Sequence, residues 1–269
     1  MVRRPAVAGR FYPAEPDKLA QSVSEYLEPT QQRAKAAGLI VPHAGYMYSG
    51  HVAGAVYARI DLPQRNIILC PNHTGFGTPL SIMKHGAWET PLGDMQIDEE
   101  LAEALVTADP HLEDDVSAHR FEHAIEVQLP FLQHLAGTAA RLVPVTIGTS
   151  NLNRLEELGR ALAKVLLEVD RSTLIIASSD MNHYESDAVT RVKDKKAIDR
   201  ILAMDPPGLH EIVRQENISM CGYGPAVAML TAAKLLGATR AELVKYATSG
   251  DVSLDFDHVV GYAGVIVSD

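Results

Sequence analysis

The stretch Gly38-Leu-Ile-Val-Pro-His-Ala-Gly-Tyr46 joins a short apolar run directly to a histidine. Two later stretches have the same form: Asn66–Pro71 (NIILCP) is followed at once by an Asn-His pair, and Thr173–Ser178 (TLIIAS) by Ser-Asp-Met-Asn-His. Short continuous runs of this kind are typical of strands that are buried on both faces of a parallel sheet. The three stretches therefore predict strands that end in residues able to do chemistry.

The other segments extend this pattern into an α/β fold. We expect strands at Gly38–Pro42, Asn66–Pro71, Arg141–Ile147, Thr173–Ser178 and Val259–Val267. Segments with 3.6-residue periodicity predict helices at Pro16–Leu27, Ser49–Ile60, Asp98–Ala108, Glu122–Leu135, Leu152–Val169, Ala188–Met204, Pro207–Gln215 and Gly224–Leu236. Ala87–Ile97 is expected to be a connecting or edge element. Strands that alternate with helices predict a mainly parallel central sheet sandwiched by helices.

Composition limits the class of protein. The chain has 269 residues without repeats or linker-like blocks, so we expect one domain over 1–269. A net charge of −10 disfavours binding to nucleic acid or to an anionic membrane, and we expect neither as a partner. Only two cysteines and no apolar run of about 18 residues favour a reducing, cytoplasmic location.

The expected strand ends predict a metal site. In open parallel sheets, ligands bind just beyond the carboxyl ends of the strands, and these ends lie along one edge. His43 and His73 follow two of the buried runs at this level. Glycines nearby allow tight turns beside the crevice. We therefore predict that His43 and His73 are metal ligands.

Cys221 is the predicted third ligand. It lies just before an apolar helix in which Pro225 suits the first turn. A cysteine beside a helix N-terminus should have a lowered pKa, which makes its thiolate available to a metal or for nucleophilic attack. The alternative is a buried, inert thiol, which is the common fate of a free cysteine.

Asp180 and His183 are the predicted catalytic residues. Asp180 can complete the metal shell or orient a liganding imidazole, and the alternative is a simple helix N-cap. His183 can serve as a general acid or base, because an ordinary imidazole titrates near neutral pH.

A further cluster, Glu122–Glu126 (EHAIE), is interpreted as pocket lining. His123 and Glu126 would share a helix face at a spacing of three, and Asn72 joins them as a pocket-lining residue beside His73. The sequence has no P-loop, no dinucleotide-binding glycine fingerprint and no Gly-x-Ser-x-Gly elbow, so the usual marks of nucleotide binding and serine hydrolysis are missing.

Several of these motifs, in this order, resemble the Memo family, whose prokaryotic members are called AmmeMemoRadiSam system protein B. The resemblance covers nearly the whole chain. The matching strings are Ala8-Gly-Arg-Phe-Tyr-Pro13, Pro42-His-Ala-Gly-Tyr46, Pro71-Asn-His-Thr74, Glu122-His-Ala-Ile-Glu126, Ser178-Ser-Asp180 with His183, and Cys221-Gly222.

This resemblance implies a fold similar to the class III extradiol dioxygenases, the LigB-like group. Those enzymes hold Fe(II) with two histidines and a glutamate, and a further histidine acts as acid–base. Carried over, the ligands are His43 and His73, the acid–base residue is His183, and Cys221 stands in place of the glutamate. A thiolate favours iron in another electronic state, copper or zinc. We expect a divalent transition metal, iron first, with copper and zinc left open.

The sequence leaves three functions open. The first is a metal-dependent oxidoreductase with a dioxygenase-like site. The second is a catalytically retired scaffold that serves as a binding module in a radical-SAM-associated modification system, with a radical-SAM protein as partner and an unidentified small molecule or peptide as ligand. The third is a zinc hydrolase with His183 as its base.

Overall fold

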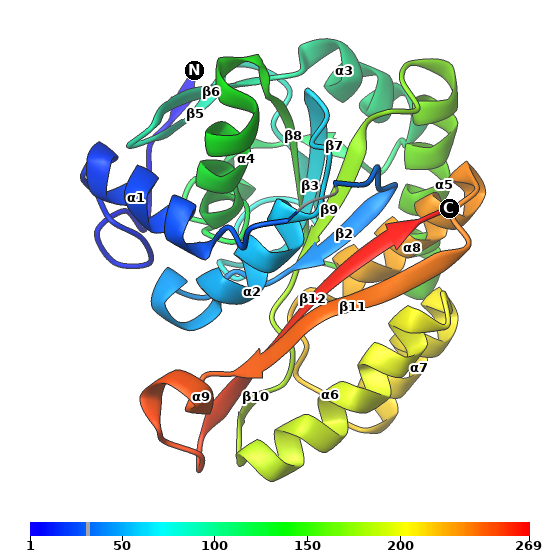
Figure 1. Ribbon diagram of the computed structural model, residues 1–269. Helices are drawn as coiled ribbons and strands as arrows, with labels where there is room; N and C mark the ends of the chain where they lie inside the picture. Colours follow the sequence, from blue (N-terminus) through cyan, green and yellow to red (C-terminus); the bar gives the residue numbers. More distant parts are fainter. Residues whose placement is uncertain (31–32) are drawn as a thin grey trace.

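The computed structural model describes residues 1–30 and 33–269. Its centre is a mostly parallel sheet in which β8 (Arg141–Ile147), β3 (Arg65–Pro71), β9 (Leu174–Ser178) and β2 (Gly38–Val41) lie side by side in that order (Figure 1). The long strand β12 (Val259–Ser268) then adds antiparallel to β2. The predicted fold class, a mainly parallel central sheet between helices, is confirmed.

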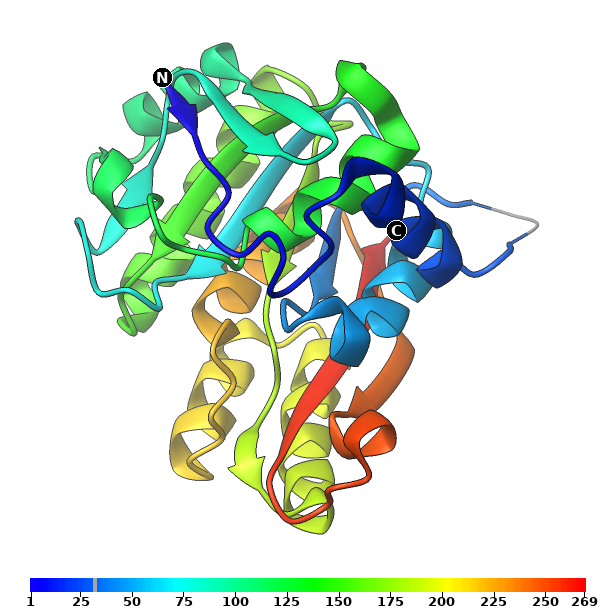
Figure 2. The same ribbon diagram turned by 90° about the vertical axis from the view of Figure 1, so that its left-hand side faces the viewer.

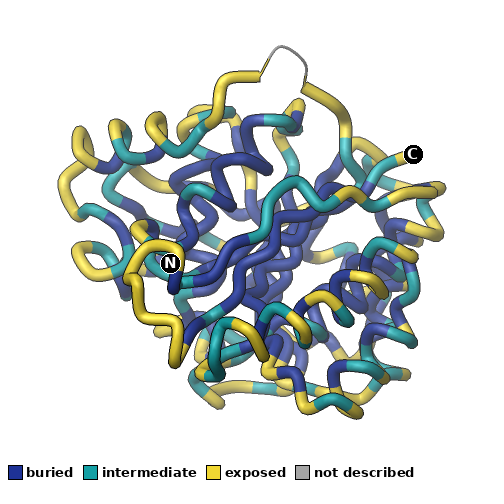
Figure 3. Tube along the Cα trace, turned by 60° about the horizontal axis from the view of Figure 1, so that its bottom comes forward, coloured by how far each residue is buried: buried dark blue, intermediate teal, exposed yellow. Residues whose placement is uncertain are grey.

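Helices cover both faces of this sheet (Figures 1 and 2). One face carries α2 (Tyr46–Ala58), with α1 (Pro16–Tyr26) and α4 (Leu129–Ala136) beside it. The other face carries α8 (Tyr223–Leu236), against which α5 (Leu152–Glu168) packs. Between them, β2 and β9 are buried along their whole length, and β3 and β8 are buried except at their first residues, in the dark core of Figure 3. Because helices cover both faces of the sheet, the sequences of β2 and β9 are continuously apolar.

The remaining elements extend the edges of the sheet. Their bounds are β1 (Val2–Arg3), β4 (Leu80–Ile82), β5 (Ala87–Thr90), β6 (Gly93–Ile97), α3 (Glu99–Ala108), β7 (Glu113–Asp114), η1 (Val116–Ala118), η2 (Glu126–Gln128), η3 (Gly137–Ala139), β10 (His183–Glu185), α6 (Asp187–Leu202), α7 (Pro206–Gln215), β11 (Arg240–Thr248) and α9 (Gly250–Ser253). No helix within the described residues is long and apolar enough to cross a membrane.

One expected helix differs from the structure, whereas the expected connecting or edge element does lie toward a sheet edge. The helix expected over Glu122–Leu135 begins only at Leu129, after the short turn η2. Pro130 suits the first turn of α4, and the Glu122 carboxylate accepts a hydrogen bond from the nearby main-chain N–H of Ala124, which competes with a helix upstream. The segment Ala87–Ile97 is the hairpin β5–β6, and β6 continues the sheet beside β8.

Candidate metal centre

The carboxyl ends of β2, β3 and β9 meet at one edge of the sheet. Because these strands are parallel and adjacent, the residues that follow them surround a common cavity of about 580 Å³. The chemically reactive side chains among its lining residues are His43, His73, His123, Asp180, His183 and Cys221. The structure thus brings together the residues that follow the three apolar runs, as the sequence predicts.

Three imidazoles form the core of the cavity. The possible ligand atoms of His43, His73 and His123 all lie within 4.8 Å of one another, so this cluster can hold a metal ion. The ring of His123 stacks on that of His73, with centroids 4.8 Å apart, and both rings are nearly perpendicular to the His43 ring. His123, expected only to line the pocket, is a full member of the cluster.

Hydrogen bonding fixes the protonation of His43. Its Nδ1 lies 3.0 Å from the hydroxyl of Ser178. That hydroxyl donates its single proton to the carbonyl of Ala124 and also accepts a bond from the Gln128 amide, so His43 Nδ1 must be the donor. Nε2 of His43 is therefore unprotonated. Burial and the neighbouring imidazoles hold the pKa of His43 well below its usual value, so the ring is neutral and able to bind a metal.

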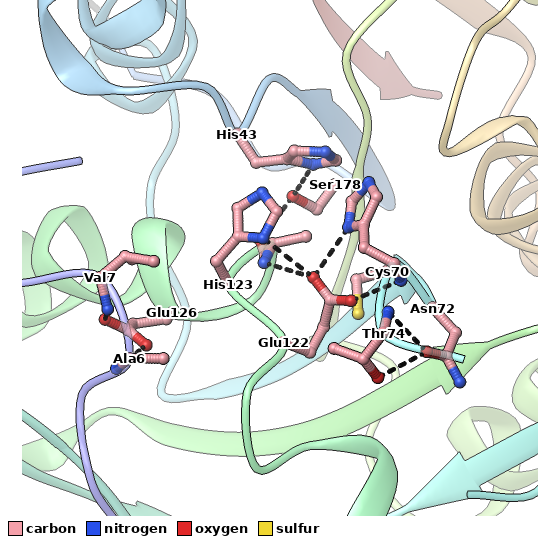
Figure 4. Close-up of polar contacts among 12 residues, drawn as sticks. Ala6, Val7, His43, Cys70, Asn72, Thr74, Glu122, His123, Glu126 and Ser178 are labelled. Carbon is pink, nitrogen blue, oxygen red and sulfur yellow. Dashed lines mark hydrogen bonds and ion pairs between the residues drawn. The ribbon is translucent and has the colours of Figure 1, made fainter. Parts of the chain in front are cut away.

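Glu122 organises the other two imidazoles (Figure 4). Its carboxylate accepts bonds from Nδ1 and the main-chain N–H of His73, at 2.9 and 2.7 Å, and lies 3.4 Å from Nδ1 of His123. Burial alone would raise the pKa of Glu122, but its hydrogen bonds to His73 and Ala124 and the nearby charges of His73 and His123 together lower it. Carboxylate–histidine pairs of this kind orient the imidazole and leave its second ring nitrogen unprotonated, so that this nitrogen can bind a metal.

Cys221 lies beside His43. Its Sγ is 3.2 Å from His43 Nε2, but it does not belong to the group of mutually close ligand atoms, which among the described residues contains the three histidines alone. The lowered pKa expected from the helix N-terminus is wrong. Burial and the charge of Asp180 raise the pKa of the Cys221 thiol instead, and they outweigh the hydrogen bonds that would lower it.

Asp180 acts through the main chain. Its Oδ1 accepts the N–H of His43 at 2.7 Å, which ties the end of β9 to the end of β2. Burial raises the pKa of this carboxyl above its usual value. It is not a helix cap, because the N-cap of α6 is Ser186.

His183 lies at the rim of the cavity, on β10. Its Nδ1 lies 2.9 Å from the carbonyl oxygen of Ser219, which can only accept, so Nδ1 carries the proton. In the neutral ring Nε2 is therefore the unprotonated nitrogen. This imidazole can therefore accept a proton from a molecule in the cavity.

Asn72 and Glu126 do not line the cavity. Asn72 turns its side chain back on its own loop and accepts the N–H groups of Thr74 and Gly75. Glu126 faces away from His123 and forms a buried ion pair with Arg3, because the helix that would have aligned the two side chains begins later (Figure 4). Their predicted pocket-lining role is corrected on these grounds.

Two site residues were missed by sequence reasoning. Ser178 and Glu122 hold the imidazoles through Nδ1, and neither contributes a ligand of its own. Glu122 is the first residue of the EHAIE string, so the motif did contain this site residue. The prediction of a helix there favours Glu126 instead, because a helix would place Glu126 beside His123. Ser178 is the last residue of a buried strand and looks like ordinary core.

Comparison with known proteins identifies the family of this chain. A family model described as "Memo-like protein" matches residues 3–266. The chain belongs to the Memo family. It is 46% identical to a MEMO1 family protein of Methanopyrus kandleri, over 99% of both chains, and 44% identical to one of Methanosarcina barkeri, over 99% of this chain and 100% of that one.

A solved structure shares the fold of this Memo-family protein. The crystal structure of an uncharacterized protein from Escherichia coli K12 superposes with a TM-score of 0.60. The match covers 86% of this chain and 100% of that one, at 15% sequence identity. At this identity the likeness shows the fold alone.

Proposed function

We propose that this Memo-family protein is a metal-dependent oxidoreductase that holds one divalent transition metal, iron first, in the cavity. The ligands are His43, His73 and Cys221, and His123 is a further donor within reach. The observation that carries the proposal is the set of imidazoles whose Nδ1 atoms are held by Ser178 and Glu122, which leaves metal-binding nitrogens facing one space.

The donor set fits a transition metal. His43 Nε2 and Cys221 Sγ lie 3.2 Å apart, which is less than the sum of a metal–nitrogen bond of about 2.0–2.1 Å and a metal–sulfur bond of about 2.3 Å. One ion can therefore bind both atoms. Imidazole and thiol donors favour iron, copper or zinc over magnesium or calcium, which prefer oxygen ligands. A bound ion would also stabilise the thiolate form of Cys221.

The chain's own residues supply the proton chemistry. His183 presents an unprotonated Nε2 at the rim, so it accepts a proton from a substrate and returns it later. Asp180 holds the main chain of His43 in place. A bound iron or copper would supply the one-electron chemistry that protein side chains lack. Because a cysteine stands where a dioxygenase-like site has a carboxylate ligand, we do not propose ring cleavage.

Metal analysis of anaerobically purified protein tests the site. We expect about one equivalent of metal in the wild type, and little in His43→Ala and Cys221→Ser. His134→Ala, at an exposed histidine, is the control and should keep its metal. Equal metal in all four proteins would reject the proposal.

The absorption spectrum identifies both the metal and its contact with sulfur. We expect a thiolate-to-metal charge-transfer band with iron or copper, which Cys221→Ser should abolish. A colourless, zinc-loaded protein would favour the hydrolase reading, with His183 as base.

The alternative reading is a binding module in a radical-SAM-associated modification system. A radical-SAM partner protein would then co-purify with the wild type and with His43→Ala alike. A complex that depends on His43 would instead connect the partner with the metal site.

A further inference from the structure

Asn182 lies fully buried between Asp180 and His183. Its Oδ1 accepts bonds from the main-chain N–H and the hydroxyl of Ser219, each at 3.0 Å. Its Nδ2 donates to a Glu185 oxygen at 2.7 Å and lies 3.3 Å from the Thr190 hydroxyl. The partners define the amide orientation, because a main-chain N–H can only donate and a carboxylate can only accept.

The main chain of Asn182 is bound on both sides as well. Its N–H donates to the buried carboxylate of Asp194 on α6 at 2.8 Å. Its carbonyl accepts the N–H of Gly261 on β12 at 2.9 Å. One buried residue therefore links α6, β10, β12 and the loop that precedes α8, elements that meet at the lower part of Figure 1.

Ser219 carries this linkage to the cavity. Its hydroxyl accepts the main-chain N–H of His183 at 2.8 Å, and its carbonyl holds the His183 imidazole. It also lies two residues before Cys221. Asn182 and Ser219 thus tie the segment that carries His183 to the loop that carries Cys221.

We infer that Asn182 is a positioning residue, which fixes the tautomer of His183 and the placement of the Cys221 loop through Ser219. Leaving a buried amide donor or acceptor unpaired costs free energy, and a shift of either segment would leave a polar group of Asn182 unpaired. The inference deepens the proposed function and rests on it for the chemical role of His183. Its readouts below use metal-free protein, so that failure of the inference and failure of the metal site are distinguished.

The test compares Asn182→Ala with Asn66→Ala in the full-length, metal-free chain. Asn66 is a matched control, because it is also fully buried and its amide lies within hydrogen-bond distance of three main-chain carbonyls, at the opposite end of β3. Long-range proton–nitrogen NMR of the imidazoles reports the tautomer of His183. We expect a single Nδ1–H form in the wild type and in Asn66→Ala, and a mixture of tautomers in Asn182→Ala.

Alkylation by N-ethylmaleimide gives a second readout. We expect Cys221 to react about fivefold faster or more in Asn182→Ala, the factor that corresponds to the loss of roughly one net hydrogen bond. Cys70 is completely buried and serves as an internal marker of global unfolding. It should stay unreactive in every variant.

Ser219→Ala covers the case in which Asn182→Ala fails to fold. It removes only the hydroxyl between Asn182 and His183, so we expect the same two changes at smaller size. A wild-type tautomer and alkylation rate in the folded variants would overturn the inference, as would equal changes in Asn66→Ala.

Discussion

Two glutamates four positions apart, Glu122 and Glu126, are both completely buried, and their carboxylates bind different partners. Glu122 accepts bonds from His73 and lies beside His123, so its charge acts on the metal centre. Glu126 forms an ion pair with Arg3 and thereby holds the N-terminal segment in place. Residue type, burial and motif are the same for both, so only the partners distinguish a site residue from a structural one.

The partners of Glu126 show why it is structural. Its carboxylate also accepts the main-chain N–H groups of Ala6 and Val7 and the hydroxyl of Tyr12 at 2.6 Å. Arg3 in turn lies 4.3 Å from the centroid of the Trp88 ring. This network ties the start of the chain to the sheet edge, and none of its residues lines the cavity, although Arg3 also donates to the main-chain carbonyl of Glu122.

The largest expected effect comes from Glu126→Ala. Removal of one partner of a buried ion pair leaves the charge of Arg3 without its carboxylate, with only main-chain carbonyls as partners, which costs about 3–5 kcal/mol of unfolding free energy. Urea denaturation at neutral pH measures this loss. The protein that remains folded should bind metal as the wild type does. A loss of metal from this folded fraction would show that Glu126 also supports the metal centre.

The next largest expected effect is a loss of stability in acid, and it comes from the buried residue His119. Burial and the charge of Arg3 lower the pKa of His119 from 6.5 to about 4. The unfolded chain then binds the extra proton between these two values, so stability falls as pH drops through this window, by up to about 3 kcal/mol for this group.

His119→Asn, which cannot be protonated, checks this expectation. Unfolding free energies measured at pH 7 and pH 4.5 should differ less in this variant than in the wild type. Replacement of the exposed His134 should leave the pH dependence unchanged. An undiminished dependence in His119→Asn would assign the acid sensitivity to other groups.

Glu122→Gln should affect the metal rather than the fold. The amide keeps the shape but loses the charge and one acceptor, so the imidazoles are held less firmly, and metal affinity should fall roughly 10- to 100-fold. Competition with a chromogenic chelator measures the change. Glu126→Gln is the matched control and should keep its affinity; equal losses in both would mean that the two carboxylates act alike.

The central sheet and the place of the site were predictable because the signals are local. An apolar run that ends in histidine indicates both a strand and its carboxyl end, and neighbouring parallel strands bring His43 and His73 together. β11 was not predicted, because its alternating, half-buried residues give no continuous apolar run.

The roles within the site were less predictable because they depend on three-dimensional neighbours. A helical reading of EHAIE placed Glu126 beside His123, whereas the real chain turns between them. The pKa of Cys221 depends on its burial and on Asp180, a residue 41 positions away in the chain, and neither is visible in the local sequence.

The smallest expected effect, Ser178→Ala, tests whether a neutral partner orients a ligand as a charged one does. The Ser178 hydroxyl holds Nδ1 of His43, and without it His43 can adopt the other tautomer, whose Nε2 cannot bind a metal. Because a neutral hydrogen bond contributes about 1 kcal/mol, metal affinity should fall about fivefold, less than for Glu122→Gln. Ser81→Ala removes another fully buried hydroxyl, one bonded to Thr78, and should leave the affinity unchanged. A loss in Ser178→Ala as large as in Glu122→Gln would show that ligand orientation matters more than the charge of the orienting group.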